Sequence, residues 1–545
     1  MVSTTALIVN TISMSFNIYV SNRVGTEAIG VFSLVMSVYA LAITISSSGV
    51  NLATMKIVSE KLARDTNCNL KRISKQCLIF SLFLGVCASA IFIILAKTIS
   101  IKWLHNKVSP VTIYFIAVAL PFISMSSSIN GYFCAVRKMY KSAFSQGLET
   151  IIKIVAILLL LNIFIDKGVE YICLALIIGD FISEVLSFMY LFFIYNLDLN
   201  KLPLYRTNSN CRKRFVNICA PVAITSYIKS GLSTLKQMLI PVKLEQSGAS
   251  CSDALSQYGL VSGMAMPIFM FPSVFINAFS NLLVPEITSF YERKEFSKIN
   301  KTISIIFTIA FAFAFCVFGV FCNFSSEIGL FIYNNNDVVF FLKLLCPLVL
   351  FIYLDNIIDC ILKGLNKQVG IMLCNILDLF VSISFICILL PKKGILGYVI
   401  VLFISEILNF SISLFQLKKT TNFNFDYMNW ILKPAFSVLV STFIIRKLAL
   451  VWDNTLQGLV FIVAIFVAIY CFIYGVISIV KRAQWCHISR VFPQTVPLQI
   501  KLFIFSKCSY SASTLFALNC FICYNINVYY INKEVNIWMR KQIAN

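Results

Sequence analysis

Long apolar runs separated by short polar stretches repeat along the first 480 residues of this 545-residue chain. A helix needs about twenty residues to cross the hydrocarbon core of a bilayer, whereas barrel strands give alternating runs of about ten residues. The pattern therefore predicts an all-α polytopic membrane protein with about fourteen transmembrane helices, near residues 2–21, 27–53, 76–96, 111–136, 147–166, 170–195, 214–240, 257–285, 302–323, 338–362, 369–390, 394–416, 430–449 and 456–480.

Composition agrees with a membrane protein. The chain is 59% hydrophobic and 12% charged, whereas soluble domains carry about 25% charged residues. The net charge of +22 would favour nucleic acid in a soluble protein, but membrane proteins concentrate Lys and Arg in cytoplasmic loops, so we expect no nucleic-acid partner. The cysteines are scattered apart from the pair Cys520 and Cys523, and the two histidines are His105 and His487. We expect buried thiols and no metal site.

The positive residues also predict the orientation of the helices. Most loop Lys and Arg residues follow the even-numbered predicted spans, and few follow the odd-numbered ones. Since cytoplasmic loops are the basic ones, we expect both ends of the helical body, near residues 1 and 480, to lie in the cytoplasm of a cell-membrane protein. An even number of spans follows from this orientation.

One motif occurs twice in the same direction. Residues 181–188 (Phe-Ile-Ser-Glu-Val-Leu-Ser-Phe) and 403–410 (Phe-Ile-Ser-Glu-Ile-Leu-Asn-Phe) share six of eight positions, and each follows a Lys-Gly turn; residues 130–138 and 359–367 also occupy equivalent places. Parallel repeats are a transporter architecture with the substrate path between the halves. We predict two parallel six-helix lobes plus two extra helices: an N-lobe 1–195, a cytoplasmic linker 196–213, a C-lobe 214–416, two further helices in 430–480 and an atypical tail 483–545.

Cationic side chains inside spans are costly in lipid and therefore mark candidate functional positions. Lys229 and Lys236 are seven residues apart, which places them on one face of the seventh span. Arg23 ends the first span, where it either snorkels to the headgroups or binds a pyrophosphate bidentately. Lys153 either pairs with Glu149, one turn before it, or joins the binding site. We predict Arg23, Lys229, Lys236 and Lys153 as substrate-binding residues.

Acidic residues within the spans are candidates for ion coupling. Glu184 and Glu406 hold the same place in the repeated motif, where they either bind an ion or form a structural hydrogen bond between helices. Asn375 precedes Asp378 by one turn, a spacing that offers two oxygen ligands to one cation. We predict these four residues as ion-coupling sites for sodium or a proton, and no other cofactor. Further acids in the spans are Asp180, Asp355 and Asp359.

Several short segments carry a family resemblance: 22–30, 47–53, 58–60, 239–241, 258–265, 271–273 and 282–287. Through them the chain resembles the multidrug/oligosaccharidyl-lipid/polysaccharide exporter superfamily and, within it, the stage V sporulation protein B group. The resemblance implies two helical bundles around a central cavity, alternating access, and export of lipid-linked glycans such as spore-cortex peptidoglycan precursors. It matches Arg23 to a cavity arginine of the lipid II flippases, although their further arginines in spans two and eight have no counterpart here. Some relatives bind sodium in the second lobe, which implies Asn375 and Asp378 as coupling residues.

We therefore expect a transporter rather than an enzyme: a monomeric flippase for an undecaprenyl-pyrophosphate-linked glycan, surrounded by membrane lipids. One alternative is a cation-coupled multidrug exporter of the same fold, which should place acids rather than Arg23, Lys229 and Lys236 in its cavity. Another is a membrane glycan polymerase. An enzyme of that kind needs acid or histidine chemistry in sizeable extramembrane loops, and the loops predicted here are short.

Overall fold

The computed structural model describes residues 2–64, 70–104, 107–200, 212–421, 423–448 and 456–479. Over these ranges every regular element is a helix, so the predicted all-α class is confirmed. The chain divides into two compact units between Phe425 and Asp426. The tail 483–545, the Cys520–Cys523 pair and both histidines lie outside the described residues.

The first unit begins with an N-lobe in which each of the first six predicted spans lies on helix. The second predicted span bends between two helices, α2 and α3. The elements are α1 (Val2–Val24), α2 (Thr26–Ser47), α3 (Val50–Arg64), α4 (Leu70–Thr98), the π-helical turn η1 (Ile99–Trp103), α5 (Pro110–Ala135), α6 (Met139–Phe164), the 3₁₀ turn η2 (Ile165–Lys167) and α7 (Val169–Asn200).

The C-lobe of the first unit contains the next six predicted spans and is more broken. Its elements are α8 (Arg212–Glu245), α9 (Cys251–Tyr258), the π-helical η3 (Gly259–Ala265), α10 (Met266–Met270), α11 (Ser273–Glu292), α12 (Phe296–Tyr333), α13 (Asn336–Leu345), α14 (Leu348–Gly364) and α15 (Gln368–Thr421). α15 is two helices joined at Gly394, where φ is 56° and ψ is −140°. The break between α13 and α14 bends the tenth predicted span by 56°.

The second unit holds the last two predicted spans, on η4 (Met428–Leu432), α16 (Lys433–Leu448) and α17 (Leu456–Ile479), and α16 packs against α17. In the described ranges ten helices are long and apolar enough to cross a membrane, or eleven if α13 and α14 count as one span. The fourteen predicted runs exceed this number because α15 contains two of them, and because neither α1 nor the segmented α9–α11 is among the ten.

The turns at equivalent places of the predicted repeat have similar backbones. Arg137, after α5, and Asn366, after α14, both adopt left-handed φ values, 59° and 58°. At each turn the amide of the following residue donates a hydrogen bond to the carbonyl oxygen five residues earlier. These bonds join Lys138 N to Phe133 O and Lys367 N to Leu362 O, both at 2.9 Å. Gly168 and Gly394 mark the later turns with φ of 102° and 56°. The same turn also closes α11, where Lys294 has φ 58° and Glu295 N donates to Phe290 O at 3.0 Å, so the turns agree with the parallel repeat but are not specific to it.

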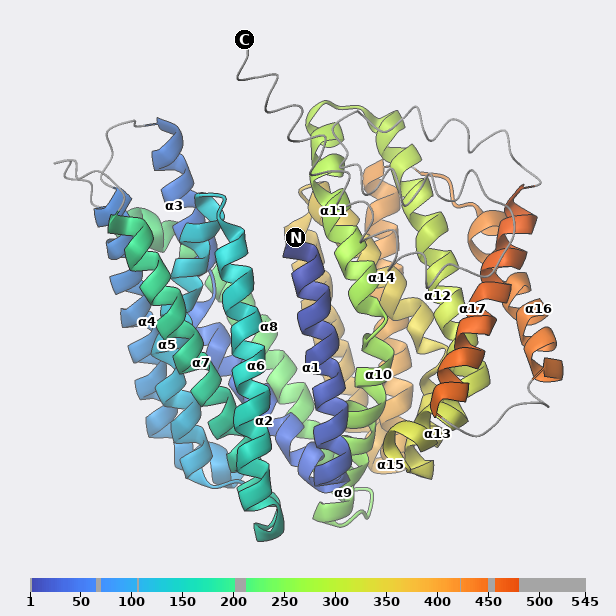
Figure 1. Cartoon of the computed structure of the whole chain (residues 1–545), viewed down its shortest axis with the longest axis horizontal. Helices are drawn as coiled ribbons and strands as arrows, with labels where there is room; N and C mark the ends of the chain where they lie inside the picture. Colours follow the sequence, from blue (N-terminus) through green and yellow to red (C-terminus); the bar gives the residue numbers. More distant parts are fainter. Residues whose placement is uncertain are drawn as a thin grey trace. The chain divides into compact units, whose positions relative to one another are not determined.

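Within the lobes, small and polar residues allow helices to approach closely. In the N-lobe α4 packs on α5 and α6 on α7, and in the C-lobe α8 and α14 pack on α15 (Figure 1). Ser124 Oγ on α5 lies 2.9 Å from the carbonyl oxygen of Ser46 and 2.7 Å from that of Ser81. Lipid solvates apolar side chains as well as a protein core does, so such polar and small-residue contacts help to hold membrane helices together.

Candidate functional site

The two predicted lysines of α8 have different surroundings. Lys229 is exposed, whereas Lys236 is partly buried and its Nζ donates a hydrogen bond to Ser382 Oγ at 3.1 Å. Lys229 interacts electrostatically with Asp359 of α14. The sequence predicted a positively charged face because α8 carries no acid near these lysines. The structure supplies acids from neighbouring helices, so that face is partly neutralised.

Lys236 belongs to a polar group that we call the C-lobe cluster, formed by Lys236, Asp378, Ser382, Ser405 and Glu406. Ser405 Oγ donates to Asp378 Oδ1 at 2.6 Å, and Ser382 Oγ lies 3.1 Å from Ser405 Oγ. The ammonium of Lys236 interacts electrostatically with the carboxylates of Asp378 and Glu406. The structure thus brings together one predicted substrate residue and two predicted coupling residues.

A second polar contact joins α14 to the end of α15. Asn409 Nδ2 donates to Asp355 Oδ2 at 2.8 Å, and Ser413 also hydrogen-bonds the Asp355 carboxylate. The predicted coupling residue Asn375 donates its amide to the carbonyl oxygen of Ile371 in its own helix, at 2.8 Å. No hydrogen bond between Asn375 and Asp378 is recorded in the part of the chain that the structure describes.

The N-lobe has its own polar group, the N-lobe cluster of Glu149, Lys153, Asp180 and Glu184. Lys153 Nζ forms an ion pair with Asp180 Oδ1 at 2.6 Å, and only 6% of the Asp180 side chain is exposed. Glu149 and Glu184 interact electrostatically with both members of this pair. The ion-pair partner of Lys153 is therefore Asp180 on the adjacent helix rather than Glu149 on its own helix. The structure brings predicted residues Lys153 and Glu184 into one cluster.

Arg23 lies at the end of α1 and is exposed. Its Nη1 donates to the hydroxyl of Tyr19, one turn earlier, at 2.8 Å. The adjacent side-chain amide of Asn22 donates to the carbonyl oxygen of Ile332 on α12, which ties the end of α1 to the C-lobe. Arg23 therefore stands beside a contact between the lobes.

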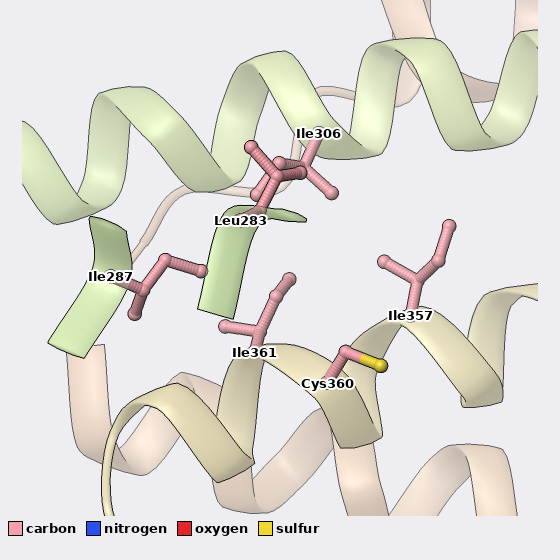
Figure 2. Close-up of a pocket in the computed structure, with 6 residues that line it drawn as sticks. All are labelled: Leu283, Ile287, Ile306, Ile357, Cys360 and Ile361. Atoms are coloured by element: carbon pink, nitrogen blue, oxygen red, sulfur yellow. The ribbon is translucent and has the colours of Figure 1, made fainter. Parts of the chain in front are cut away.

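An apolar pocket between α11, α12 and α14 offers no alternative site for a charged ligand. Figure 2 shows its side chains facing one another, five aliphatic groups and one thiol, with no charged group among them. They belong to Leu283, Ile287, Ile306, Ile357, Cys360 and Ile361. This pocket suits neither a pyrophosphate nor a cation.

Sequence reasoning missed two members of the C-lobe cluster and one neighbour of the N-lobe cluster. Ser405 is the serine of the repeated motif and Ser382 stands one turn after Asp378, so both signals were present but were not used. Tyr39 of α2 is buried and interacts electrostatically with Glu184, Asp180 and Glu149. Nothing in the pattern of α2 indicates that its tyrosine faces the N-lobe cluster, because that contact depends on how α2 packs against α7.

The chain shows similarity to known proteins over most of its length. The model of the family described as "Polysaccharide biosynthesis protein" matches residues 1–247. Stage V sporulation protein B of Bacillus subtilis (strain 168) is 22% identical over 388 residues, which cover 70% of this chain and 75% of the relative. Sporulation protein YkvU of the same organism is 21% identical over 340 residues, covering 62% and 74%.

Solved structures share the fold. The inward closed conformation of the lipid II flippase MurJ superposes with a TM-score of 0.66 at 13% identity, covering 88% of this chain and 98% of that one. An inward-facing multidrug resistance MATE family transporter of the MOP superfamily gives 0.59 at 14% identity, covering 77% and 99%. The predicted resemblance to this superfamily is confirmed, and the chain is a multi-pass helical membrane protein with that fold. The relatives that carry a functional name are a flippase and transporters, in agreement with the expectation of a transporter.

Proposed function

We propose that the protein is a flippase that moves an undecaprenyl-pyrophosphate-linked glycan across the cell membrane by alternating access of its two lobes, in cell-wall or spore-cortex synthesis. The observation that carries the proposal is the pair of lysines on α8, Lys229 and Lys236, in a chain with the fold of a lipid II flippase. Similarity to two sporulation proteins supports the cellular role.

The charge of the substrate explains why this pair matters. A pyrophosphate cannot enter a region of low dielectric without cations that offset its loss of hydration. Lys229 is exposed and able to meet such a ligand, and Arg23 offers a planar guanidinium at the end of α1. In this proposal Lys153, which is held by Asp180, stays a candidate substrate contact within the N-lobe.

The same contacts give a route to coupling. When a pyrophosphate draws the ammonium of Lys236 away from Asp378, the carboxylates of Asp378 and Glu406 lose their counter-charge. They then take up a sodium ion or a proton, with Asn375 close by on the same helix. In the N-lobe Glu184 is the corresponding coupling candidate. Binding of the substrate would thus favour binding of the coupling ion, and by reciprocity the ion would favour binding of the substrate, as coupled transport requires.

The proposal includes an orientation and an assembly state. The excess of Lys and Arg in alternate loops supports a cytoplasmic location for both ends of the helical body. The turns between α1 and α2 and between α8 and α9 would then face outward. Both lobes belong to one chain, so a monomer is sufficient to form the substrate path between them.

Purified protein in liposomes tests the function. A fluorescent undecaprenyl-pyrophosphate glycan should be transported by the wild-type protein, and the variant Lys229→Ala/Lys236→Ala should lose at least about 90% of this rate, which corresponds to at least about 1.4 kcal/mol. Lys243→Ala is the matched control, because Lys243 lies on the same helix but hydrogen-bonds Gln246 at its end. Undiminished transport in the double variant, with the control active, would remove the lysine pair from the mechanism.

The same vesicles separate the alternative function. Three acids of the C-lobe, Asp359, Asp378 and Glu406, interact electrostatically with a fourth, Asp355, and this group favours a cation-coupled drug exporter as the second candidate. An exporter of that class should move an organic-cation dye and leave the glycan in place. Imposed sodium and proton gradients test the coupling, and a glycan transport rate that responds to neither gradient would contradict it.

A further inference from the structure

Two cysteines from separate helices face each other at the break between α13 and α14. Cys322 Sγ of α12 lies 3.2 Å from the Sγ of Cys346, which stands between the last residue of α13 and the first residue of α14. The thiol of Cys346 also donates to the carbonyl oxygen of Phe318, one turn before Cys322, at 3.4 Å. Cys346 therefore packs over a single turn of α12, with its sulfur next to that of Cys322.

The two thiols differ in their access to reagents. Cys346 is buried, with 1% of its surface exposed, whereas Cys322 is exposed. In thiol–disulfide exchange an accessible thiol reacts with the oxidant first, and a neighbouring resolving thiol then completes the disulfide. The accessible Cys322 and the buried Cys346 are arranged for these two roles.

The separation of the two sulfurs favours a direct bond over a shared metal ion. Two thiolates on one tetrahedral zinc ion stand about 3.8 Å apart, because each Zn–S bond is about 2.3 Å long. The sulfurs of Cys322 and Cys346 are closer than this. Among the described residues, no group of three or more His, Cys, Asp or Glu side chains is placed to hold a metal ion. A disulfide therefore suits the pair better than a metal does.

The pair lies towards the outer face of the membrane in the proposed orientation. α13 lies at the same end of the first unit as α9 (Figure 1), and the turn between α8 and α9 faces outward in that orientation. Disulfides persist outside the cytosol, where thiol-reducing systems do not act on them. This location rests on the proposed function, whereas the pairing of the thiols rests on the contacts of Cys346 with α12.

We infer that Cys322 and Cys346 form an oxidation site, which reacts with a disulfide-containing oxidant and links α12 to the break between α13 and α14. Cys322 loses its proton and attacks one sulfur of the oxidant, whose S–S bond breaks; the released thiolate takes up the proton. Cys346 then attacks Cys322 Sγ, breaks the mixed disulfide and gives its proton to the second thiolate. The two cysteines together lose two electrons and two protons, and the oxidant is reduced to two thiols.

The disulfide restrains the bend between α13 and α14. Pro347 has no N–H and cannot continue the hydrogen bonds of α13, and Val349 N donates to Cys346 O at 3.3 Å, only three residues back. Cys346 is thus the residue at which the chain bends by 56° into α14. A covalent bond from Cys346 to α12 fixes the position of this residue.

Mapping of the thiols in the purified full chain tests the site. The protein in lipid nanodiscs is treated with 2-hydroxyethyl disulfide, the remaining thiols are alkylated, and the peptides are identified by mass spectrometry. The wild type should give a linked pair of peptides that contain Cys322 and Cys346, whereas Cys346→Ser should retain the mixed disulfide on Cys322. Loss of the Cys346 thiol should be at least about tenfold slower in Cys322→Ser than in the wild type, because its reaction with Cys322 is intramolecular.

Cys87→Ser is the matched control, because it removes an exposed thiol of α4 in the N-lobe. This variant should form the linked pair at the wild-type rate. Recovery of Cys322 and Cys346 on separate peptides from the wild type, as free thiols or as mixed disulfides, would overturn the oxidation site. Linkage of either cysteine to a different one would also overturn it.

Hydrogen–deuterium exchange measures the effect on the bend. The amides of Val349 and Leu350 should exchange at least about fivefold more slowly in the oxidised wild type, and dithiothreitol should restore the original rates. Equal rates before and after oxidation would overturn the restraint on the bend. Neither measurement contains the glycan, so a failure of glycan transport would contradict the proposed function and leave both results intact.

Discussion

At the scale of single residues, the charges inside the helices are arranged in two clusters rather than as isolated groups. Lys153 and Asp180 form the centre of one, and Lys236 and Asp378 that of the other. The sequence identified all four residues as unusual, since charges in apolar runs are conspicuous. It could not identify the partners, because Lys153 and Asp180 come from helices whose rotation about their axes depends on packing against α2 and α5.

The N-lobe pair gives a prediction about stability. Lys153→Met leaves the Asp180 carboxylate buried without its ion pair, so it should lower the free energy of unfolding by about 1–3 kcal/mol. The second repeat has a leucine, Leu402, at the place of Asp180. Adding Asp180→Leu to Lys153→Met should therefore recover most of the lost stability. Thermal unfolding in detergent, followed by tryptophan fluorescence, measures both effects. Lys97→Met, at an exposed position in α4, is the control, and an equal effect of Lys153→Met and Lys97→Met would contradict the prediction.

At the scale of elements, the spans themselves were predictable and their breaks were not. Runs of about twenty apolar residues place helices correctly because lipid demands that length. The α2–α3 break at Gly49 instead comes from a tertiary contact: a Cβ there would lie 2.8 Å from the carbonyl oxygen of Cys219 on α8. Likewise η3 is a π-helix where it crosses α2, which no periodicity in residues 257–285 indicates.

The turns between helices give a second prediction. Gly168 has φ 102° and ψ 171°, and a Cβ at this position meets no described atom within 4 Å. Gly168→Ala should therefore cost about 1–3 kcal/mol through backbone strain alone. Gly147 lies within α6, and a Cβ added there would lie 3.8 Å from a Val9 methyl group, an ordinary contact. Gly147→Ala should therefore be neutral or stabilising by up to about 1 kcal/mol, because alanine favours the helix. The same unfolding assay compares them, and equal stability of the two variants would show that the turn imposes no strain.

At the scale of the whole molecule, the last residues of the first unit pack against helices of the same unit. The segment after α15 returns to α12, where the rings of Phe423 and Phe307 lie 5.5 Å apart and those of Phe425 and Phe311 6.1 Å apart. The second unit begins at Asp426 and holds the last two predicted spans; that these two spans are an addition to twelve is a prediction from the repeated motif. The predicted limits of the lobes stay a prediction.

A chain ending at Phe425 should therefore insert and fold. It keeps twelve predicted spans and thus the same side of the membrane for both ends. We expect a monodisperse peak in size-exclusion chromatography and a far-ultraviolet circular dichroism spectrum with helix content close to that of the full chain. A chain ending at Gly364, which cuts the C-lobe before α15, is the control and should aggregate. Aggregation of the longer chain as well would show that the second unit is needed for folding.

The motif that occurs in both α7 and α15, at residues 181–188 and 403–410, points to an origin by gene duplication and fusion. Both copies cross the membrane in the same direction, so a six-helix precursor needs only one insertion orientation to pair with itself. A precursor of antiparallel repeats needs dual topology. Two identical copies must each have a surface that is complementary to itself. After fusion the two halves can change independently, and they have diverged. One holds a lysine against Asp180, and the other has Leu402 at that place and a lysine beside Asp378 instead. A self-paired precursor must duplicate every charge, whereas the fused chain assigns different charges to each half.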